Sequence, residues 1–291
     1  MQCGKAPAKE GVMTDIQQRT EASSPYGPWD AAMDELMSYR YVASRPRRLD
    51  RTHGDGRIAL RPDLRSASGD ALAAPLAIAM LDTAGICIDR IWILALTQIN
   101  VALLDGARDV EEVFLDGQVI REARSQIFTE ARLYDSADRD RAIGFGTANW
   151  SVIVDTPPGH VYPEPGTGIE GLAEVPPLWE AYTGRRRTDG LIEIPGLSPK
   201  IGTDRLHHGP MLVVTEATAL EAAAEATGIN ALAIEHLALT IVAPGRTGPF
   251  VSTPVFVSVR GDVIGVRVEL RDRGQQDRLV ATAFVRMRRT E

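Results

Sequence analysis

The sequence predicts an α+β protein made of two related units of similar size, in each of which a long apolar helix is followed by a run of strands. Apolar helical stretches at 71–90 and 210–226 each precede four strand-like segments. An acidic residue, Asp82 in the first and Glu216 in the second, interrupts each apolar stretch. The second set of elements follows the first at a nearly constant offset, which indicates duplicated domains rather than a short-period array.

The two units can be placed in register. Ile58 falls opposite Ile192 at an offset of 134 (192 − 58), and the two mid-helix acids keep that offset (216 − 82). Thr147 falls opposite Thr282 at an offset of 135 (282 − 147). The alignment therefore drifts by one residue between the helices and the last strands, which is what a duplication with a few small insertions produces.

The first 56 residues read as a tail that contains a short helix at 28–41, where apolar residues recur at helical spacing. The first domain follows at 57–154. It begins with a short strand at 57–62 and continues into the helix 71–90, which is apolar nearly all round, as an enclosed helix should be. Turn residues such as Asp-Gly separate the expected strands, which are 93–104, 111–120, 124–133 and 142–154.

The second domain, 188–291, repeats this order after a Pro- and Gly-rich crossover at 155–187. The crossover is too long for a tight turn, and we expect it to follow the surface in an extended form. A short strand at 190–195 leads to the helix 210–226. The strands expected after it are 232–242, 251–259, 263–271 and 279–288.

Composition excludes several classes of protein. A net charge of −7 and only 5% aromatic residues argue against a nucleic-acid binder. The two cysteines, Cys3 and Cys87, lie in unlike surroundings and indicate no disulfide framework. No Cys or His residues stand at metal-ligand spacing, and we expect neither a metal nor another cofactor.

The N-terminal stretch lacks the apolar core of a signal peptide, and polar residues interrupt the most apolar region, 71–104. That region is therefore expected to be a buried helix and strand, not a membrane span. These features favour a cytoplasmic protein with no membrane insertion.

Two motifs resemble a known family. The first unit contains MLDTAG around Asp82, and in the second His207-His208-Gly209 is followed by Glu216 seven residues later. Both resemble segments of the phenylacetic-acid-type acyl-CoA thioesterases, which have the hotdog fold, a long helix wrapped by an antiparallel sheet. The resemblance covers about 200 residues. Two units in one chain are similar to the double hotdog proteins, in which one chain imitates the usual dimer. Hotdog dimers often assemble further, so a homodimer of this chain is an expectation.

The resemblance implies a site between the two units, with an acyl-CoA or another acyl thioester as substrate. Gly209 begins the helix of one unit, and its backbone N–H would polarise the thioester carbonyl. Asp82 from the other unit would act as general base or as nucleophile. His207 and His208 complete the motif, and Glu216 is the acid of a mirror-related second site.

The second site is expected to be incomplete. At the 134-residue offset, Pro75 falls opposite Gly209, and proline has no N–H to donate. One working site per chain is therefore expected, which pairs Asp82 with the start of the second helix.

Each of these catalytic assignments has a purely structural alternative. Asp82 could satisfy a neighbouring backbone group, His207 and His208 could cap the helix, and Glu216 could lie on an ordinary charged face with Glu221 and Glu225. The expected function is hydrolysis of an acyl thioester in lipid metabolism. The alternatives are a non-catalytic binder of acyl-CoA or another apolar ligand, and an enoyl-thioester hydratase or dehydratase. A medium or long acyl chain is suggested by apolar residues on the two helices, which are Leu72, Leu76, Met80, Met211 and Val213.

Overall fold

The computed structural model of the 291-residue chain describes residues 36–88, 92–155 and 176–290. Its described strands form one antiparallel sheet in the order β1-β2-β4-β5-β6-β3-β9-β12-β11-β10-β8-β7. The first six in the chain are β1 (Arg47–Arg48), β2 (His53–Ala59), β3 (Trp92–Leu103), β4 (Glu112–Glu122), β5 (Gln126–Asp135) and β6 (Ala142–Asp155). The others are β7 (Arg185–Arg186), β8 (Ile192–Ile194), β9 (Leu232–Ile241), β10 (Phe250–Arg260), β11 (Val263–Asp272) and β12 (Arg278–Arg289).

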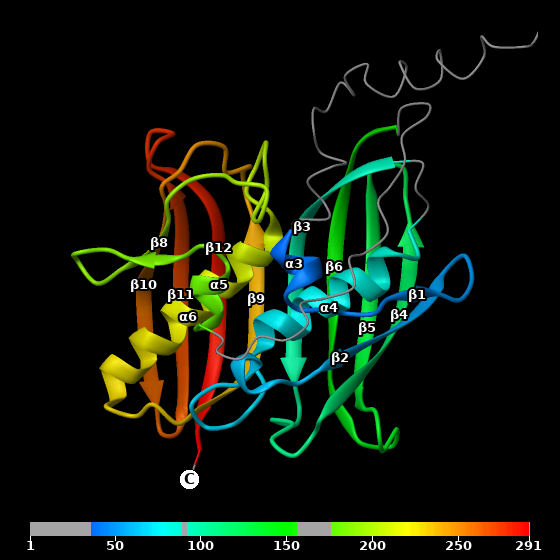
Figure 1. Cartoon of the computed structure of the whole chain (residues 1–291), viewed down its shortest axis with the longest axis horizontal. Coiled ribbons are helices and arrows are strands. Elements are labelled where there is room, and N and C mark those ends of the chain that lie inside the picture. Colours follow the sequence, from blue (N-terminus) through cyan, green and yellow to red (C-terminus); the bar gives the residue numbers. More distant parts are fainter. Residues whose placement is uncertain (1–35, 89–91, 156–175, 291) are drawn as a thin grey trace, which may run out of the picture.

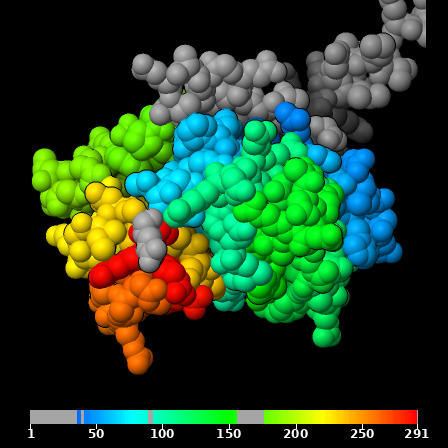
Figure 2. All heavy atoms as spheres, turned by 90° about the horizontal axis from the view of Figure 1, so that it is seen from below, coloured from blue at the N-terminus to red at the C-terminus, as the bar shows by residue number. Residues whose placement is uncertain are grey.

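The order of the last six strands mirrors that of the first six. The two halves meet where β3 pairs with β9, from Gln98↔Thr240 to Ala102↔His236. In the view from below, the cyan and green atoms of the first half lie directly against the yellow to red atoms of the second (Figure 2). One continuous sheet therefore carries both halves.

Two long helices, α4 (Ala73–Gly85) and α6 (His208–Thr227), lie across the same face of this sheet (Figure 1). Every residue of α4 from Ala73 to Ala84 is buried, and Asp82 is among them. α6 ends at Gly228, whose φ of 69° is a left-handed conformation that glycine adopts without strain. Burial all round explains why apolar residues dominate α4, and α6 is buried over most of its length.

Two four-residue helices, α3 (Met37–Arg40) and α5 (Leu178–Ala181), precede two buried tyrosines. Tyr41 and Tyr182 follow these helices directly, and their rings meet edge to face with centroids 6.0 Å apart. The Tyr182 hydroxyl donates a hydrogen bond to the Met37 carbonyl oxygen at 3.1 Å. Segments 141 residues apart (182 − 41) thus lie side by side.

The structure modifies several boundaries. The first long helix was expected at 71–90 but ends at Gly85, because the chain then tightens into turns. Only Met37–Arg40 of the expected helix 28–41 forms α3, and 28–35 lie outside the described residues. The crossover was expected to be extended, yet its described end contains α5 and β7. Among the described helices, none is long and apolar enough to cross a membrane.

Candidate functional site

Asp82 lies in the last two turns of α4 and is 8% exposed. Its Oδ2 accepts a hydrogen bond from the hydroxyl of Ser44, which lies in the loop after α3 and is itself buried. Among the described residues, none donates a hydrogen bond to the other oxygen, Oδ1. Asp82 is therefore a buried carboxyl group with one oxygen fixed and one oxygen available.

The start of α6 is built from His207, His208 and Gly209. His207 is the N-cap residue, but its side chain does not cap the helix. Its Nδ1 instead lies 3.0 Å from the Ser38 hydroxyl. The His208 ring lies against that of His207 and at right angles to Trp150 of β6, with ring centroids 3.8 Å and 6.3 Å away. The capping role considered for these histidines is therefore not their side-chain role.

Gly209 is buried where the first half of the chain approaches α6 closely. A Cβ atom at this position would collide with the Ser38 hydroxyl and would lie 3.3 Å from the ring of Tyr182. Glycine is therefore required here by close approach rather than by backbone conformation. The Ser38 hydroxyl thus lies on the Cβ side of Gly209, next to the residue to which the resemblance assigns the oxyanion donor.

Tyr182 connects Asp82 with the start of α6. Burial, followed by the charge of Asp82, raises the pKa of Tyr182 well above its ordinary value. The same ring lies beside Gly209. Tyr182 thus lies beside Gly209 and within reach of the charge of Asp82, while no described hydrogen bond joins Asp82 to α6 directly.

The ionisable groups of this cluster all have shifted pKa values. Burial raises the pKa of Asp82 from 3.8 to about 7, which the hydrogen bond from Ser44 partly opposes. Burial lowers the pKa of His207 to about 4. Burial, with a smaller contribution from His207, lowers the pKa of His208 well below its ordinary value. Near neutral pH both histidines are uncharged, and Asp82 is the group that titrates.

Glu216 occupies the position in α6 that corresponds to Asp82 in α4, but its hydrogen-bond partners differ. It is 2% exposed, so the expectation of an ordinary charged face shared with Glu221 and Glu225 is wrong. Its Oε1 accepts hydrogen bonds from the backbone N–H groups of Ala73 and Ala74, at 2.7 and 2.9 Å. Burial raises the pKa of Glu216 to about 8, against the effect of these two bonds. Glu216 therefore caps α4 from the opposite helix.

The second site was expected to lack a backbone donor because Pro75 falls opposite Gly209, and this reason is wrong. Pro75 does lack an N–H, but Ala73 and Ala74 before it supply two donors at the start of α4. Those donors are occupied by the carboxyl group of Glu216. Asp82 makes no corresponding described hydrogen bond to the start of α6 and is bonded to Ser44 instead.

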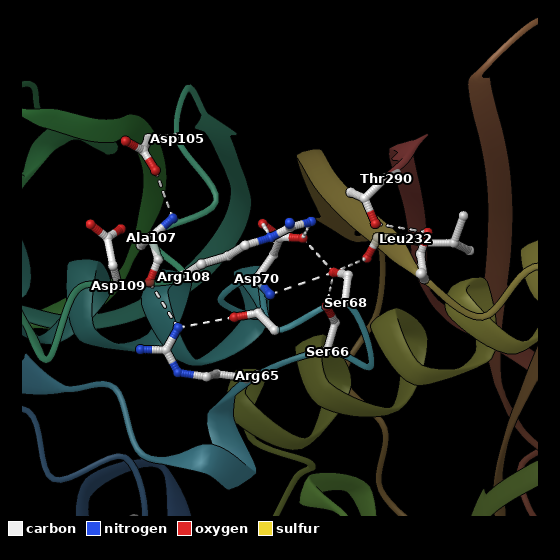
Figure 3. Close-up of polar contacts among 12 residues, drawn as sticks. Arg65, Ser66, Ser68, Asp70, Asp105, Ala107, Arg108, Asp109, Leu232 and Thr290 are labelled. Carbon is white, nitrogen blue, oxygen red and sulfur yellow. Dashed lines mark hydrogen bonds and ion pairs between the residues drawn. The ribbon is translucent and has the colours of Figure 1, made fainter.

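A polar network holds the loop that leads into α4 (Figure 3). The Arg65 guanidinium donates to the carbonyl oxygens of Gly69 and Ala107, and Arg108 forms an ion pair with the buried Asp70 at 2.9 Å. The Ser68 hydroxyl donates to the Leu232 carbonyl oxygen at the start of β9, 3.1 Å away. This loop is thereby tied to both halves of the chain.

The five apolar residues suggested as an acyl-chain lining are all buried in the main hydrophobic cluster, which also contains Tyr41 and Tyr182. They are core residues in this structure. Cys87 is buried and its pKa is raised to about 11 by burial, first among the causes. In the described part of the chain, no cluster of three or more His, Cys, Asp or Glu residues could hold a metal ion.

Ser38, Ser44 and Tyr182 were not identified from the sequence. They belong to short segments whose periodicity is too brief to interpret. One signal was available: MSYRY and LWEAY each place a tyrosine directly after a four-residue helix, at 41 and 182. This repeat lies outside the 134-residue register.

Comparison with family models and with curated proteins gives no match. Solved structures do match over most of the chain. The tesB protein of Mycobacterium avium subs paratuberculosis is 15% identical, with a TM-score of 0.57 over 85% of this chain and 96% of that one. An acyl-CoA thioesterase II from Mycobacterium marinum is 12% identical, with a TM-score of 0.53 over 84% of this chain and 95% of that one.

A third structure is a conserved protein of unknown function with a hotdog fold from Alicyclobacillus acidocaldarius. It is 11% identical, with a TM-score of 0.54 over 90% of this chain and 98% of that one. At these identities the likeness concerns the fold. With its long helices against a large antiparallel sheet, the chain has the hotdog fold.

Proposed function

We propose that the chain is a tandem of two hotdog domains, 57–154 and 188–291, that act together as an acyl-CoA thioesterase. The mirrored strand order about the β3–β9 junction supports the tandem. The helix–acid pattern in each half supports a site between the domains. The names of the matching structures, which include an acyl-CoA thioesterase II, support the reaction class.

The proposal depends above all on one observation: the carboxyl group of Asp82 is buried, and its described partner is a neutral hydroxyl. A buried acid without a compensating cation is costly, and Asp82 has none among its described partners. With a pKa of about 7 it can both accept and release a proton near neutral pH, as a general base must. The charge of Asp82 raises the pKa of Tyr182, whose ring lies beside Gly209, and this supports a role for Asp82 near the start of α6.

In the proposed reaction, Oδ1 of Asp82 takes a proton from water, and the resulting hydroxide attacks the thioester carbonyl carbon. The oxygen that becomes negative is stabilised by the backbone N–H groups at the start of α6, foremost that of Gly209. The C–S bond then breaks, and the thiolate leaves with the proton returned by Asp82. His207 and His208, both neutral, orient the start of the helix rather than transfer protons.

The second mirror-related site is proposed to be closed, because Glu216 fills the helix start that would receive a substrate carbonyl. One substrate per chain follows. A medium or long acyl chain remains a proposal from the apolar sequence of the two helices alone, because the five residues suggested as its lining are core residues.

A second candidate function is binding of an acyl-CoA without hydrolysis. The observation that favours it is the close packing around Gly209, where a Cβ atom would meet the Ser38 hydroxyl and the ring of Tyr182. If this packing keeps a thioester carbonyl away from the start of α6, the ligand binds and is not hydrolysed.

The test is thiol release from short-, medium- and long-chain acyl-CoA esters, with ligand-induced stabilisation measured on the same samples. A thioesterase releases thiol from at least one ester. A binding protein is stabilised by a ligand and releases none. A hydratase changes the absorbance of an enoyl-CoA without thiol release.

A further inference from the structure

Ser44 reaches Asp82 from a segment 38 residues earlier in the chain. Its side chain is buried, and its hydroxyl donates to Oδ2 of Asp82. The interaction joins the loop after α3 to the last turns of α4. It is the one hydrogen bond that the described residues make to this carboxyl group.

The backbone holds Ser44 in place independently of Asp82. On one side, the Arg61 guanidinium donates to the Tyr41 carbonyl oxygen at 2.9 Å and lies 5.0 Å from the centre of the Tyr41 ring. On the other side, the Arg45 N–H donates to the Arg57 carbonyl oxygen on β2 at 3.0 Å. Loss of the Ser44 hydroxyl would therefore leave the loop anchored on both sides.

The turn before Ser44 has an uncommon backbone conformation. Ala43 has a φ of 52°, in the left-handed region that costs a non-glycine residue about 1 kcal/mol or more. Such a conformation persists where the surroundings determine it, and here Tyr41 and Val42 on one side are buried in the core. The turn directs Ser44 inward to the carboxyl group instead of outward to solvent.

A carboxylate that acts as a base needs one oxygen held and the other free. The bond from Ser44 fixes Oδ2 and leaves Oδ1 without a donor among the described residues. A hydroxyl that donates to a carboxylate also favours its ionised form over its neutral form. Ser44 thus affects both the orientation of the Asp82 carboxylate and the fraction of it that is ionised near neutral pH.

We propose that Ser44 is a positioning residue for Asp82, which holds Oδ2 so that Oδ1 faces the substrate and keeps the carboxylate available as a base. This inference rests on the proposed thioesterase function. It assigns Ser44 a role in the same site without contact with the substrate.

Tyr182, His207 and His208 do not titrate in the same range as Asp82, whereas Glu216, with a pKa of about 8, does. Tyr182 faces Asp82 from the segment after α5 and stays protonated, because its pKa is raised. His207, with a pKa of about 4, and His208, whose pKa burial lowers well below its ordinary value, stay neutral near the pKa of Asp82. Glu216, on α6, is bonded to the start of α4, at the other end of that helix. A change in the acid limb of activity on substitution of Ser44 therefore reports on Asp82.

The test compares Ser44→Ala with the wild type in two measurements: kcat/KM for a hydrolysed acyl-CoA between pH 5.5 and 9, and the titration of the Asp82 carboxyl by ¹³C NMR, assigned by its absence in Asp82→Asn. The expected result is an upward displacement of both curves by about one pH unit. At pH 6 activity falls about tenfold, and at pH 9 it stays within about twofold of the wild type. Ser44→Thr, which keeps the hydroxyl, restores the wild-type curve.

Ser252→Ala is the matched control. Ser252 is buried, and its hydroxyl accepts a hydrogen bond from Thr218 at 2.8 Å, away from Asp82. Its loss lowers stability but leaves the pH profile in place. An active Ser44→Ala protein whose activity and Asp82 titration match the wild type overturns the role of Ser44 alone. A wild-type protein that releases no thiol from any acyl-CoA overturns the proposed function, and the role of Ser44 with it.

Discussion

Replacement of Asp82 by asparagine should stabilise the protein at alkaline pH while it removes activity. Asparagine has nearly the same shape and keeps an oxygen that can accept the Ser44 hydrogen bond. It carries no charge that must be buried. Replacement of a residue that serves only the structure should lower the free energy of unfolding. Replacement of a buried catalytic acid by a neutral residue of the same shape should raise it.

The magnitude follows from the shifted pKa of Asp82. At roughly 1.36 kcal/mol per pKa unit, the rise from 3.8 to about 7 corresponds to about 4 kcal/mol. Because the folded-state pKa is raised, the folded protein keeps a proton between pH 4 and 7 that the unfolded chain has lost. Stability therefore falls as pH rises through this window and levels off above pH 7. The asparagine side chain does not titrate, so the variant lacks this fall.

The assay is urea unfolding of both proteins at pH 5 and pH 8. The other titrating groups are common to both and cancel in the comparison. The advantage of Asp82→Asn should widen by about 3 kcal/mol between the two pH values, since two pH units lie between pH 5 and the pKa of about 7. Equal stability differences at both pH values, or a variant less stable than the wild type at pH 8, would refute the reasoning.

Asp272 supplies the matched control. It is fully buried, and its carboxylate accepts hydrogen bonds from the backbone N–H groups of Arg246, Thr247 and Gly248, at 2.9, 3.0 and 2.8 Å. Asp272→Asn loses acceptors that three donors need, and should be destabilised by about 2 kcal/mol or more at pH 8. Opposite outcomes at two buried aspartates separate a carboxyl group kept for chemistry from one kept for structure.

Three further predictions concern the same site. The acid limb of kcat/KM should have its midpoint near pH 7, with activity lost as pH falls, because Asp82 must be ionised to accept a proton; a midpoint near pH 4 would contradict this. Gly209→Ala should be inactive and destabilised by about 2 kcal/mol or more in thermal unfolding, because its Cβ collides with Ser38, whereas Gly85→Ala, with no atom closer than 3.9 Å, should keep both activity and stability. Glu216→Gln should keep activity within about twofold, because its amide oxygen still accepts from the start of α4; inactivity of this variant would mean that the second acid is catalytic.

The elements that depend on long-range apolar patterning could be predicted from the sequence. Both long helices and the eight long strands lie where the periodicity places them, with shifts of a few residues at their ends. Asp82 stands out in the sequence itself, because an unpaired acid is unfavourable in an otherwise apolar, buried helix. Gly209 was marked by the resemblance, and its tight surroundings give a physical reason for glycine there.

The remainder of the site depends on contacts between distant segments. Ser38 and Ser44 lie in a short stretch with no readable period, and their partners are 169 and 38 residues away in the chain. Glu216 looked like one of several acids on an exposed helix face, because its partners, the N–H groups of Ala73 and Ala74, are 143 and 142 residues away. Backbone donors have no sequence signature, so no local pattern could have shown that this carboxyl group closes a helix end.

The central claim is that one acid, Asp82, performs thioester hydrolysis while its mirror-related partner, Glu216, does not. The most direct test is thiol release at pH 8 by the wild type, Asp82→Asn and Glu216→Gln, on the acyl-CoA that the wild type hydrolyses fastest. We expect Asp82→Asn to lose activity by at least about a hundredfold and Glu216→Gln to retain it. Full activity in Asp82→Asn, or loss of activity only in Glu216→Gln, would contradict it.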